Sequence, residues 1–351
     1  MNVIPCAICN SQEQRFLYEG RDRLMKIPGT FIVVQCPRCG LIFINPQPDA
    51  REIARYYPDD YFHYHRFTVD AQRSNAWERL VLTYHYGYPQ DGGIRGVDFL
   101  MRGIASFLKY HYHGLVPYVP DGKLLDLGCG SGEMLYKLKA LGWDTYGVEI
   151  SQSASQYAQE MGLKVYTGRV EEVKFPDGFF DVIRLYAVFE HLPNPVETLS
   201  ELKRILKSSG RILMVLQNID SLNYRLFRDK WFHLDVPRHL FSFSPKTLSL
   251  ICSKAGLTIE KITTFSGVIG LLMSLHYLID ERGIHGGFVL GRKPIARKRW
   301  LRRMVGPLMF FVDRAGYGDL MEVEIGKGNS EECTIPNVWQ GNGGRISRSW
   351  R

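Results

Sequence analysis

Glycines and acidic residues stand together where the sequence predicts a strand, a tight turn and a helix. Residues 124–132 read LLDLGCGSG, and the next predicted strand, residues 144–150, carries a carboxylate at Glu149 near its end. Backbone N–H groups at such a junction can face a nucleotide. The pattern therefore predicts a nucleotide-binding turn, whose residues are Asp126, Gly128, Cys129, Gly130 and Gly132.

The glycine spacing separates two kinds of nucleotide. Dinucleotide-binding turns have the spacing G-x-G-x-x-G, whereas this turn is G-x-G-x-G, with Glu133 at the third glycine position. Asp126 would also repel a pyrophosphate at close range. A ligand with an amino-acid moiety, a ribose and an adenine fits better, with Asp126 near the ammonium, directly or through water, and Glu149 on the ribose hydroxyls. An NAD-dependent oxidoreductase is the alternative.

At these residues the chain resembles the class I S-adenosylmethionine (SAM) dependent methyltransferases. The first motif of that family matches residues 125–132, and further family elements follow in register at residues 175–183 and 190–195, in a helix at 202–210 and in the fifth strand at 211–215. The resemblance implies an α/β fold, a Rossmann-like seven-stranded methyltransferase sheet with helices on both faces. It also implies that SAM is held by the turn residues and by Glu149, Ile150 and Tyr186.

The adenine side of the expected pocket departs from the family pattern. The family has a Gly-Asp pair after its third strand, where this sequence has Gly168-Arg169. Adenine recognition is therefore expected to shift to the backbone of Val170 and to Glu171.

The candidate catalytic residues follow the fourth and fifth strands of the family. Ligands of open α/β sheets bind beyond the carboxyl ends of the strands, where Tyr186, Glu190 and His191 would lie. A sulfonium methyl is already activated, so the protein chiefly aligns the acceptor, and a hydroxyl acceptor also benefits from a histidine base. His191 is the first candidate base, although Glu190 and His191 could instead only fix the loop.

His239 is the second candidate base. It lies in residues 230–244, where the family places its acceptor-recognition segment and where aromatic, acidic and basic residues are mixed. A metal ion on His233 and His239 has thin support, because only one carboxylate lies nearby in this segment.

Four cysteines near the start of the chain form two C-x-x-C knuckles. Each knuckle is followed by a residue that suits a tight turn, Asn10 or Gly40, so that backbone N–H groups can face the thiolates. Four sulfurs paired in this way predict a closed, structural zinc site. Two disulfides are the alternative, but three further cysteines and the lack of an export signal pattern favour reduced thiols. The predicted zinc ligands are Cys6, Cys9, Cys36 and Cys39.

The chain divides into four predicted parts, since its 351 residues exceed one typical domain of roughly 100 to 200 residues. An aromatic run at residues 56–62 is expected to pack against its neighbours or to form a lid. The methyltransferase domain is expected to contain a basic helical insertion at about residues 267–314, followed by an antiparallel last strand at residues 316–325. The four parts are a zinc-ribbon-like module (1–48), a helical linker or lid (49–118), the methyltransferase domain (119–327) and a disordered tail (328–351).

Charge and hydropathy narrow the choice of partner. A formal net charge of +8 favours an anionic partner. The basic run at residues 291–312 is flanked by apolar segments, as in an interfacial helix at an anionic membrane, and an ordinary helical cap is the alternative. No apolar stretch reaches the ~20 residues of a membrane span. We therefore expect a cytoplasmic protein, with peripheral contact at the inner face of the membrane as a further option.

These observations together favour a SAM-dependent methyltransferase with a small-molecule acceptor, such as a sugar, lipid-linked or secondary-metabolite intermediate. An RNA base methyltransferase that uses the zinc module and the basic insertion is the alternative. Phosphate binding normally needs a clustered basic face, and the charges of the zinc module nearly balance. A binding protein with a vestigial cofactor fold is disfavoured by the presence of Asp126 and Glu149.

Overall fold

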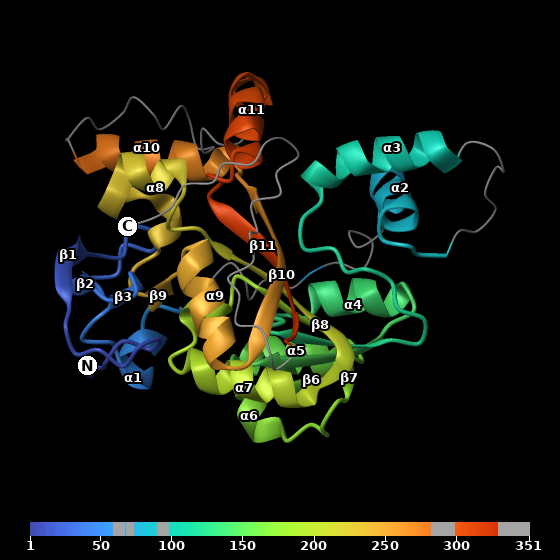
Figure 1. The fold of residues 1–351 in the computed structure, drawn as a ribbon, viewed down its shortest axis with the longest axis horizontal. Coiled ribbons are helices and arrows are strands. Elements are labelled where there is room, and N and C mark those ends of the chain that lie inside the picture. The colour runs from blue at the N-terminus through green and yellow to red at the C-terminus, as the bar shows by residue number, and fades with distance from the viewer. Residues whose placement is uncertain (59–66, 68–73, 90–97, 282–298, 329–351) are drawn as a thin grey trace.

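The computed structural model describes residues 1–58, 67, 74–89, 98–281 and 299–328 (Figure 1). Its centre is a seven-stranded sheet in the order β10-β11-β8-β7-β4-β5-β6. The strands β6, β5, β4, β7 and β8 run parallel, and β11 is antiparallel to both β8 and β10. The strands are β4 (Lys123–Leu127), β5 (Asp144–Glu149), β6 (Lys164–Thr167), β7 (Phe180–Tyr186), β8 (Leu206–Gln217), β10 (Leu257–Phe265) and β11 (Leu320–Lys327).

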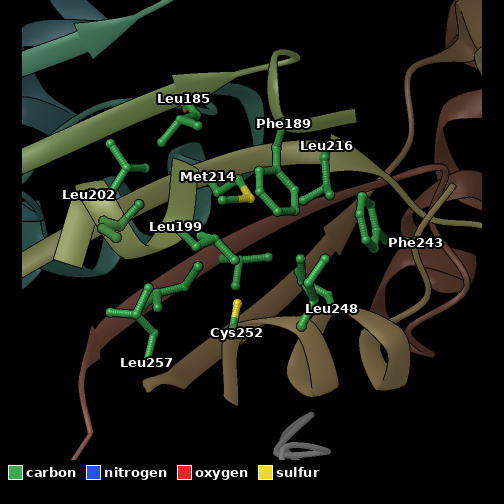
Figure 2. Packing of buried hydrophobic residues seen from close by; sticks show 14 of the residues in the cluster. Leu185, Phe189, Leu199, Leu202, Met214, Leu216, Phe243, Leu248, Cys252 and Leu257 are labelled. Carbon is green, nitrogen blue, oxygen red and sulfur yellow. The ribbon is translucent and has the colours of Figure 1, made fainter. Parts of the chain in front are cut away.

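Helices cover both faces of this sheet, which confirms the predicted α/β class. Side-chain alternation along β4 places Leu124 and Leu125 in two different hydrophobic clusters. The cluster around Leu125 includes residues of β7, α7, α9 and β8 (Figure 2), whereas the one around Leu124 includes residues of α2 (Ala76–Tyr84) and α4. The helices that pack here are α4 (Glu133–Ala140), α5 (Gln152–Glu160), α6 (Val170–Val173), α7 (Pro195–Ile205) and α9 (Pro245–Lys254).

Local capping fixes where several helices begin. Ser151 accepts a hydrogen bond from the N–H of Ala154 at the start of α5, and Ser244 caps α9, whose first residue is Pro245. Side-chain oxygens at these positions satisfy backbone donors that the helix leaves unpaired. Asp49 makes the same kind of cap for α1 (Ala50–Ala54).

The N-terminal module is a second, four-stranded antiparallel sheet. It contains β1 (Arg15–Gly20), β2 (Phe31–Gln35) and β3 (Ile42–Ile44) in that order. The fourth strand is β9 (Phe241–Ser242), which follows β8 in the sequence and pairs with β3. The module therefore shares its sheet with the segment that follows β8.

The remaining described elements surround one end of the central sheet. The described residues also contain four short 3-10 helices, besides eleven α-helices and eleven strands. These are η3 (Lys109–His111), η4 (Phe189–His191), η5 (Arg228–Lys230) and η6 (Phe232–Leu234). The other helices are α2 (Ala76–Tyr84), α3 (Asp98–Leu108), α8 (Leu222–Phe227), α10 (Val268–Glu281) and α11 (Arg299–Arg314).

The ends of one helix and one strand differ from their predicted positions. The helix expected to reach residue 210 ends at Ile205, because the chain continues directly into β8, where Leu206 pairs with Phe180. The last strand begins at Leu320 instead of residue 316, because Gly316 and Tyr317 still bond back to α11. The predicted basic insertion is seen as α10 and α11, while residues 282–298 and the tail from residue 329 lie outside the described residues.

Candidate functional site

The glycine turn between β4 and α4 takes the backbone path that its sequence requires. Gly128, Gly130 and Gly132 all have positive φ, at 70°, 54° and 86°. A side chain at Gly128 would overlap Val188, which follows the carboxyl end of β7. The turn thus lies directly against the loop that leads to Glu190 and His191.

Glu149 supports the turn and closes one side of the site. Its Oε2 accepts a hydrogen bond from the N–H of Gly130 at 2.8 Å, and its Oε1 accepts one from Ser151 at 2.8 Å. Burial raises the pKa of this carboxyl, although the N–H groups of Ser151 and Gly130 act in the opposite direction. Each oxygen has a second lone pair with which it can accept a ligand hydroxyl.

Asp126 forms a buried ion pair that the glycine motif does not predict. Its Oδ1 lies 2.8 Å from Nη1 of Arg184, the one charged residue in the buried central part of β7. Burial raises the pKa of Asp126, and Arg184 opposes that rise. Arg184 also lies over the ring of Tyr186 at 4.9 Å and donates to the carbonyl of Gly114. In the sequence, the only feature that marks Arg184 is that it is a charged residue within an otherwise apolar predicted strand.

The other predicted cofactor residues lie at the carboxyl ends of the strands. Ile150 follows β5 and is 73% exposed, and Tyr186 ends β7 with 37% exposed. Val170 is buried at the start of α6. Glu171 accepts a hydrogen bond from Thr198 of α7, so its carboxylate also ties two helices together. Its part in adenine recognition stays a prediction.

Glu190, His191 and His239, which were predicted singly as candidate catalytic residues, meet in one cluster. Their ligand atoms, one from each residue, all lie within 4.8 Å of one another, and the rings of the two histidines are 4.6 Å apart. Glu190 is 1% exposed, and burial raises the pKa of its carboxyl to about 8. Tyr57, from the aromatic run after α1, adds a hydroxyl 2.8 Å from Nδ1 of His191. Sequence patterns gave no specific signal for Tyr57.

The loop that carries His239 is held by a buried arginine. Arg238 is fully buried, and its Nη2 lies 2.6 Å from Asp235 and 2.7 Å from Asp22 of the N-terminal module. His239 donates from Nδ1 to the carbonyl of His233 at 2.9 Å, which fixes its ring. Asp22 and Arg238 were not predicted, because only the fold brings them together.

The four N-terminal cysteines form a compact sulfur group. The Sγ atoms of Cys6 and Cys39 are 3.4 Å apart, and those of Cys9 and Cys36 are 3.5 Å apart. Burial acts to raise the pKa of Cys36, but the N–H groups of Cys39 and Arg38 lower it to about 7. Asn10 and Gly40 adopt positive φ where the knuckles end, as expected. The group could hold a tetrahedral metal ion.

This fold and site define a class of protein. A parallel sheet extended by an antiparallel β11, a glycine turn after β4 and an acid at the end of β5 are the features expected of class I SAM-dependent methyltransferases. Residues 100–262 match the family model of a methyltransferase domain. The chain carries a SAM-dependent methyltransferase domain of class I.

Two relatives and one solved structure show the range of similarity. An uncharacterized protein of Methanocaldococcus jannaschii is 29% identical over 124 residues, which are 35% of this chain and 58% of that protein. Ubiquinone biosynthesis O-methyltransferase of Nitrosococcus oceani is 23% identical over 211 residues, 56% of this chain and 86% of that protein. The crystal structure of a SAM-dependent methyltransferase from Archaeoglobus fulgidus is 22% identical, with a TM-score of 0.42 over 64% of this chain and 92% of that one. The chain thus spans little more than half of the first of these relatives.

Proposed function

We propose that this chain transfers the methyl group of SAM to an oxygen of a small-molecule acceptor. The observation that carries the proposal is the buried cluster of Glu190, His191 and His239, which lies next to the glycine turn through the Gly128–Val188 contact. Bound SAM supplies a methyl group already activated on a sulfonium. An N/O cluster at the reacting end suits an acceptor whose proton must be removed. Relatives named ubiquinone biosynthesis O-methyltransferase favour the same chemistry.

Each residue of the site has a defined task in this proposal. Asp126 lies near the ammonium of SAM, and Glu149 accepts the ribose hydroxyls while it holds the turn. Ile150 packs on the adenine. His191 and His239 bind the acceptor and take up its proton, and Glu190 stabilises the charge that His239 gains, since its Oε1 lies 3.9 Å from Nε2 of that ring. Tyr186 and Tyr57 exclude water from the reacting groups.

The four-cysteine group holds a structural zinc ion in this proposal. The paired sulfur distances and the knuckle N–H groups support it. Because four protein sulfurs leave no open coordination position, this ion stabilises the module and takes no part in the transfer.

The proposed partner surface is an anionic membrane at the cytoplasmic side. No helix of the described residues is long and apolar enough to cross a bilayer. The side chains of Met304, Leu308 and Phe311 nevertheless form an exposed apolar stripe on α11. On α2 and α3, a groove of about 480 Å³ is lined by Trp77, Phe99, Leu100, Gly103, Ile104, Phe107 and Leu108.

The helices α3 and α11 both lie near the top of the view in Figure 1. The ring of Tyr110 in η3, directly after α3, lies 5.0 Å from that of Phe310 in α11. Arg102 and Arg314 are exposed on the same two helices. Apolar side chains flanked by cations suit a surface of anionic lipid, which would bring a lipid-linked acceptor to the site.

The test of the proposed function uses methyl-labelled SAM, the pure chain and host-cell lysate. The label is then divided among organic-soluble, water-soluble small-molecule, RNA and protein fractions. Label in either small-molecule fraction supports the proposal, and the organic fraction favours a lipid-linked acceptor. Label in RNA would replace the small-molecule acceptor with a nucleic acid.

A further inference from the structure

The cluster of Glu190, His191 and His239 has the composition of a metal site. The three ligand atoms lie within 4.8 Å of one another, and all three residues are buried or half-buried. Glu190 Oε2 is a buried oxygen with no hydrogen-bond partner in the described part of the chain. A buried carboxylate oxygen without a partner is costly unless a cation or a ligand completes it.

The backbone orients both imidazoles toward such a role. Nδ1 of His191 lies 2.9 Å from the carbonyl of Arg238, and Nδ1 of His239 lies 2.9 Å from the carbonyl of His233. A carbonyl oxygen can only accept, so these contacts place the hydrogen on Nδ1 and the lone pair on Nε2. Metal-binding histidines are usually held by this kind of outer hydrogen bond.

The scaffold of the cluster is rigid on both sides. Glu190 and His191 form η4, and the carbonyl of Glu190 accepts a hydrogen bond from the N–H of Leu240 at 2.9 Å. Arg238, next to His239, is locked between Asp22 and Asp235. Sites held by packed elements keep the ligand geometry that a metal ion requires.

We propose that Glu190, His191 and His239 bind one divalent transition-metal ion that holds the methyl acceptor through its oxygen. Two imidazole nitrogens and one carboxylate oxygen favour ions such as Zn²⁺ over Mg²⁺ or Ca²⁺. Three protein ligands leave coordination positions open. They suit an acceptor with a hydroxyl beside a second oxygen, as in a catechol or an α-hydroxy carbonyl compound, since both oxygens can bind one ion. This acceptor class rests on the proposed methyl transfer, whereas the metal site does not.

The ion would act as a Lewis acid on the acceptor hydroxyl. With Nε2 of both imidazoles bound to the ion, the ion replaces His191 and His239 as the group that activates the acceptor, and the coordinated hydroxyl loses its proton to water. The resulting oxygen forms a bond to the methyl carbon as the carbon–sulfur bond breaks, and the electron pair of that bond stays on sulfur. The products are the methyl ether, S-adenosylhomocysteine and one proton.

Zinc content tests the site without any assay of activity. The full chain is dialysed to equilibrium against micromolar Zn²⁺, and bound zinc is counted per chain for the wild type and for Glu190→Gln, His239→Gln and His111→Gln. His111, the exposed last residue of η3, is the matched control. We expect both cluster variants to hold one zinc equivalent fewer than the wild type and the control. Binding of S-adenosylhomocysteine shows that each variant is folded.

Equal zinc content in all four proteins would overturn the site, because a site of two imidazole nitrogens and one carboxylate oxygen that fails to bind Zn²⁺ would bind Mn²⁺ or Fe²⁺ still more weakly. Loss of zinc from Glu190→Gln alone, with His239→Gln unchanged, would also overturn the three-ligand assignment. Failure of the two proposals can be told apart. If the cluster binds no metal but label reaches a small molecule, only the metal site fails. If the metal binds and no small molecule is labelled, the proposed function fails.

Discussion

Asp22 and Arg238 form a buried ion pair across 216 residues of sequence, with Oδ1 and Nη2 2.7 Å apart. Both side chains are fully buried. Burial alone would lower the pKa of Arg238, but Asp235 and Asp22 hold it above its usual range. The pair joins the N-terminal module to the loop that carries His239, so the module helps to position a catalytic candidate.

Replacement of Arg238 should destabilise the protein strongly. Arg238→Met leaves Asp22 buried without its partner, and removal of one member of a buried pair typically costs about 3–5 kcal/mol. Urea unfolding measures the loss, with Arg51→Met on exposed α1 as the control. The double variant Asp22→Asn, Arg238→Met should lose less stability than the two single variants lose in total. If its loss equalled that total, the two residues would not be coupled.

Replacement of Glu149 should weaken cofactor binding. Glu149→Ala removes the acceptor that orders Gly130 and the proposed acceptor of the ribose hydroxyls, and loss of a charged hydrogen-bond partner costs about 1.5–3 kcal/mol. Calorimetry with S-adenosylhomocysteine measures the change, and Glu160→Ala on the outer face of α5 is the control. An unchanged affinity would show that the pocket lies elsewhere.

Metal removal should unfold the N-terminal module first. A chelator that strips the proposed zinc leaves buried thiols without their ion, and the binding free energy of structural zinc is also folding free energy. We expect amide exchange to rise in β1–β3 and in β9, with much smaller changes in β4–β6. Cys36→Ser should reproduce this pattern without a chelator. If the chelator left amide exchange in β1–β3 and β9 unchanged, the four cysteines would not hold a structural zinc ion.

Acid should weaken the contact between the module and α10. Burial would raise the pKa of Glu281, but Arg23, Arg21 and Lys230 lower it to about 2. Because the folded-state pKa lies below the ordinary value of 4.5, the ionised group stabilises the fold above about pH 4.5. That contribution is lost as the pH falls from about 4.5 toward 2.

The variant Glu281→Gln tests this pH dependence. We expect it to lower the free energy of unfolding at pH 7 by about 1–2 kcal/mol, after allowance for solvent screening of the partly exposed pair. Its difference from the wild type should shrink as the pH approaches 2. Denaturant titrations at several pH values give both quantities. A difference that stays constant with pH would mean that the loss comes from packing and not from charge.

Membrane contact should depend on the apolar stripes of α3 and α11. Phe107 is 71% exposed and Leu308 is 61% exposed. Phe107→Ser or Leu308→Ser should weaken binding to phosphatidylglycerol vesicles about fivefold or more, since burial of such a side chain contributes about 1.5–3 kcal/mol. Sedimentation with vesicles measures it, and Phe16→Ser, at an exposed residue of the N-terminal module, is the control. Equal binding of all variants would place the contact elsewhere.

Local sequence patterns predicted the central sheet and the cofactor turn well. The turn at residues 128–132 depends on glycines that alone suit its positive φ values, and Glu149 follows from the end of one short strand. Such features are encoded within about 30 residues of sequence, so spacing is enough to find them. The start of β8 was misplaced because residues 207–210, KSSG, lack apolar periodicity.

Contacts between distant segments were beyond these patterns. The partners of Asp126, His191 and Arg238 are Arg184, Tyr57 and Asp22, and only the folded chain brings each pair together. Glu190, His191 and His239 were predicted singly, but their meeting depends on how the loop after β8 returns to η4. Hydrophobic periodicity reports which face of an element is buried, and it carries no information about which polar groups meet across that face.

The pairing of β9 with β3 limits how this chain can be divided or recombined. A shortened protein that begins after residue 48 would expose β9 as an edge strand and would remove Asp22 from Arg238, and such edges invite aggregation. Exchange of the module with that of a relative would have to carry residues 231–243 with it. The cysteine knuckles and residues 231–243 therefore have to be kept or exchanged together, although almost 200 residues separate them in the sequence.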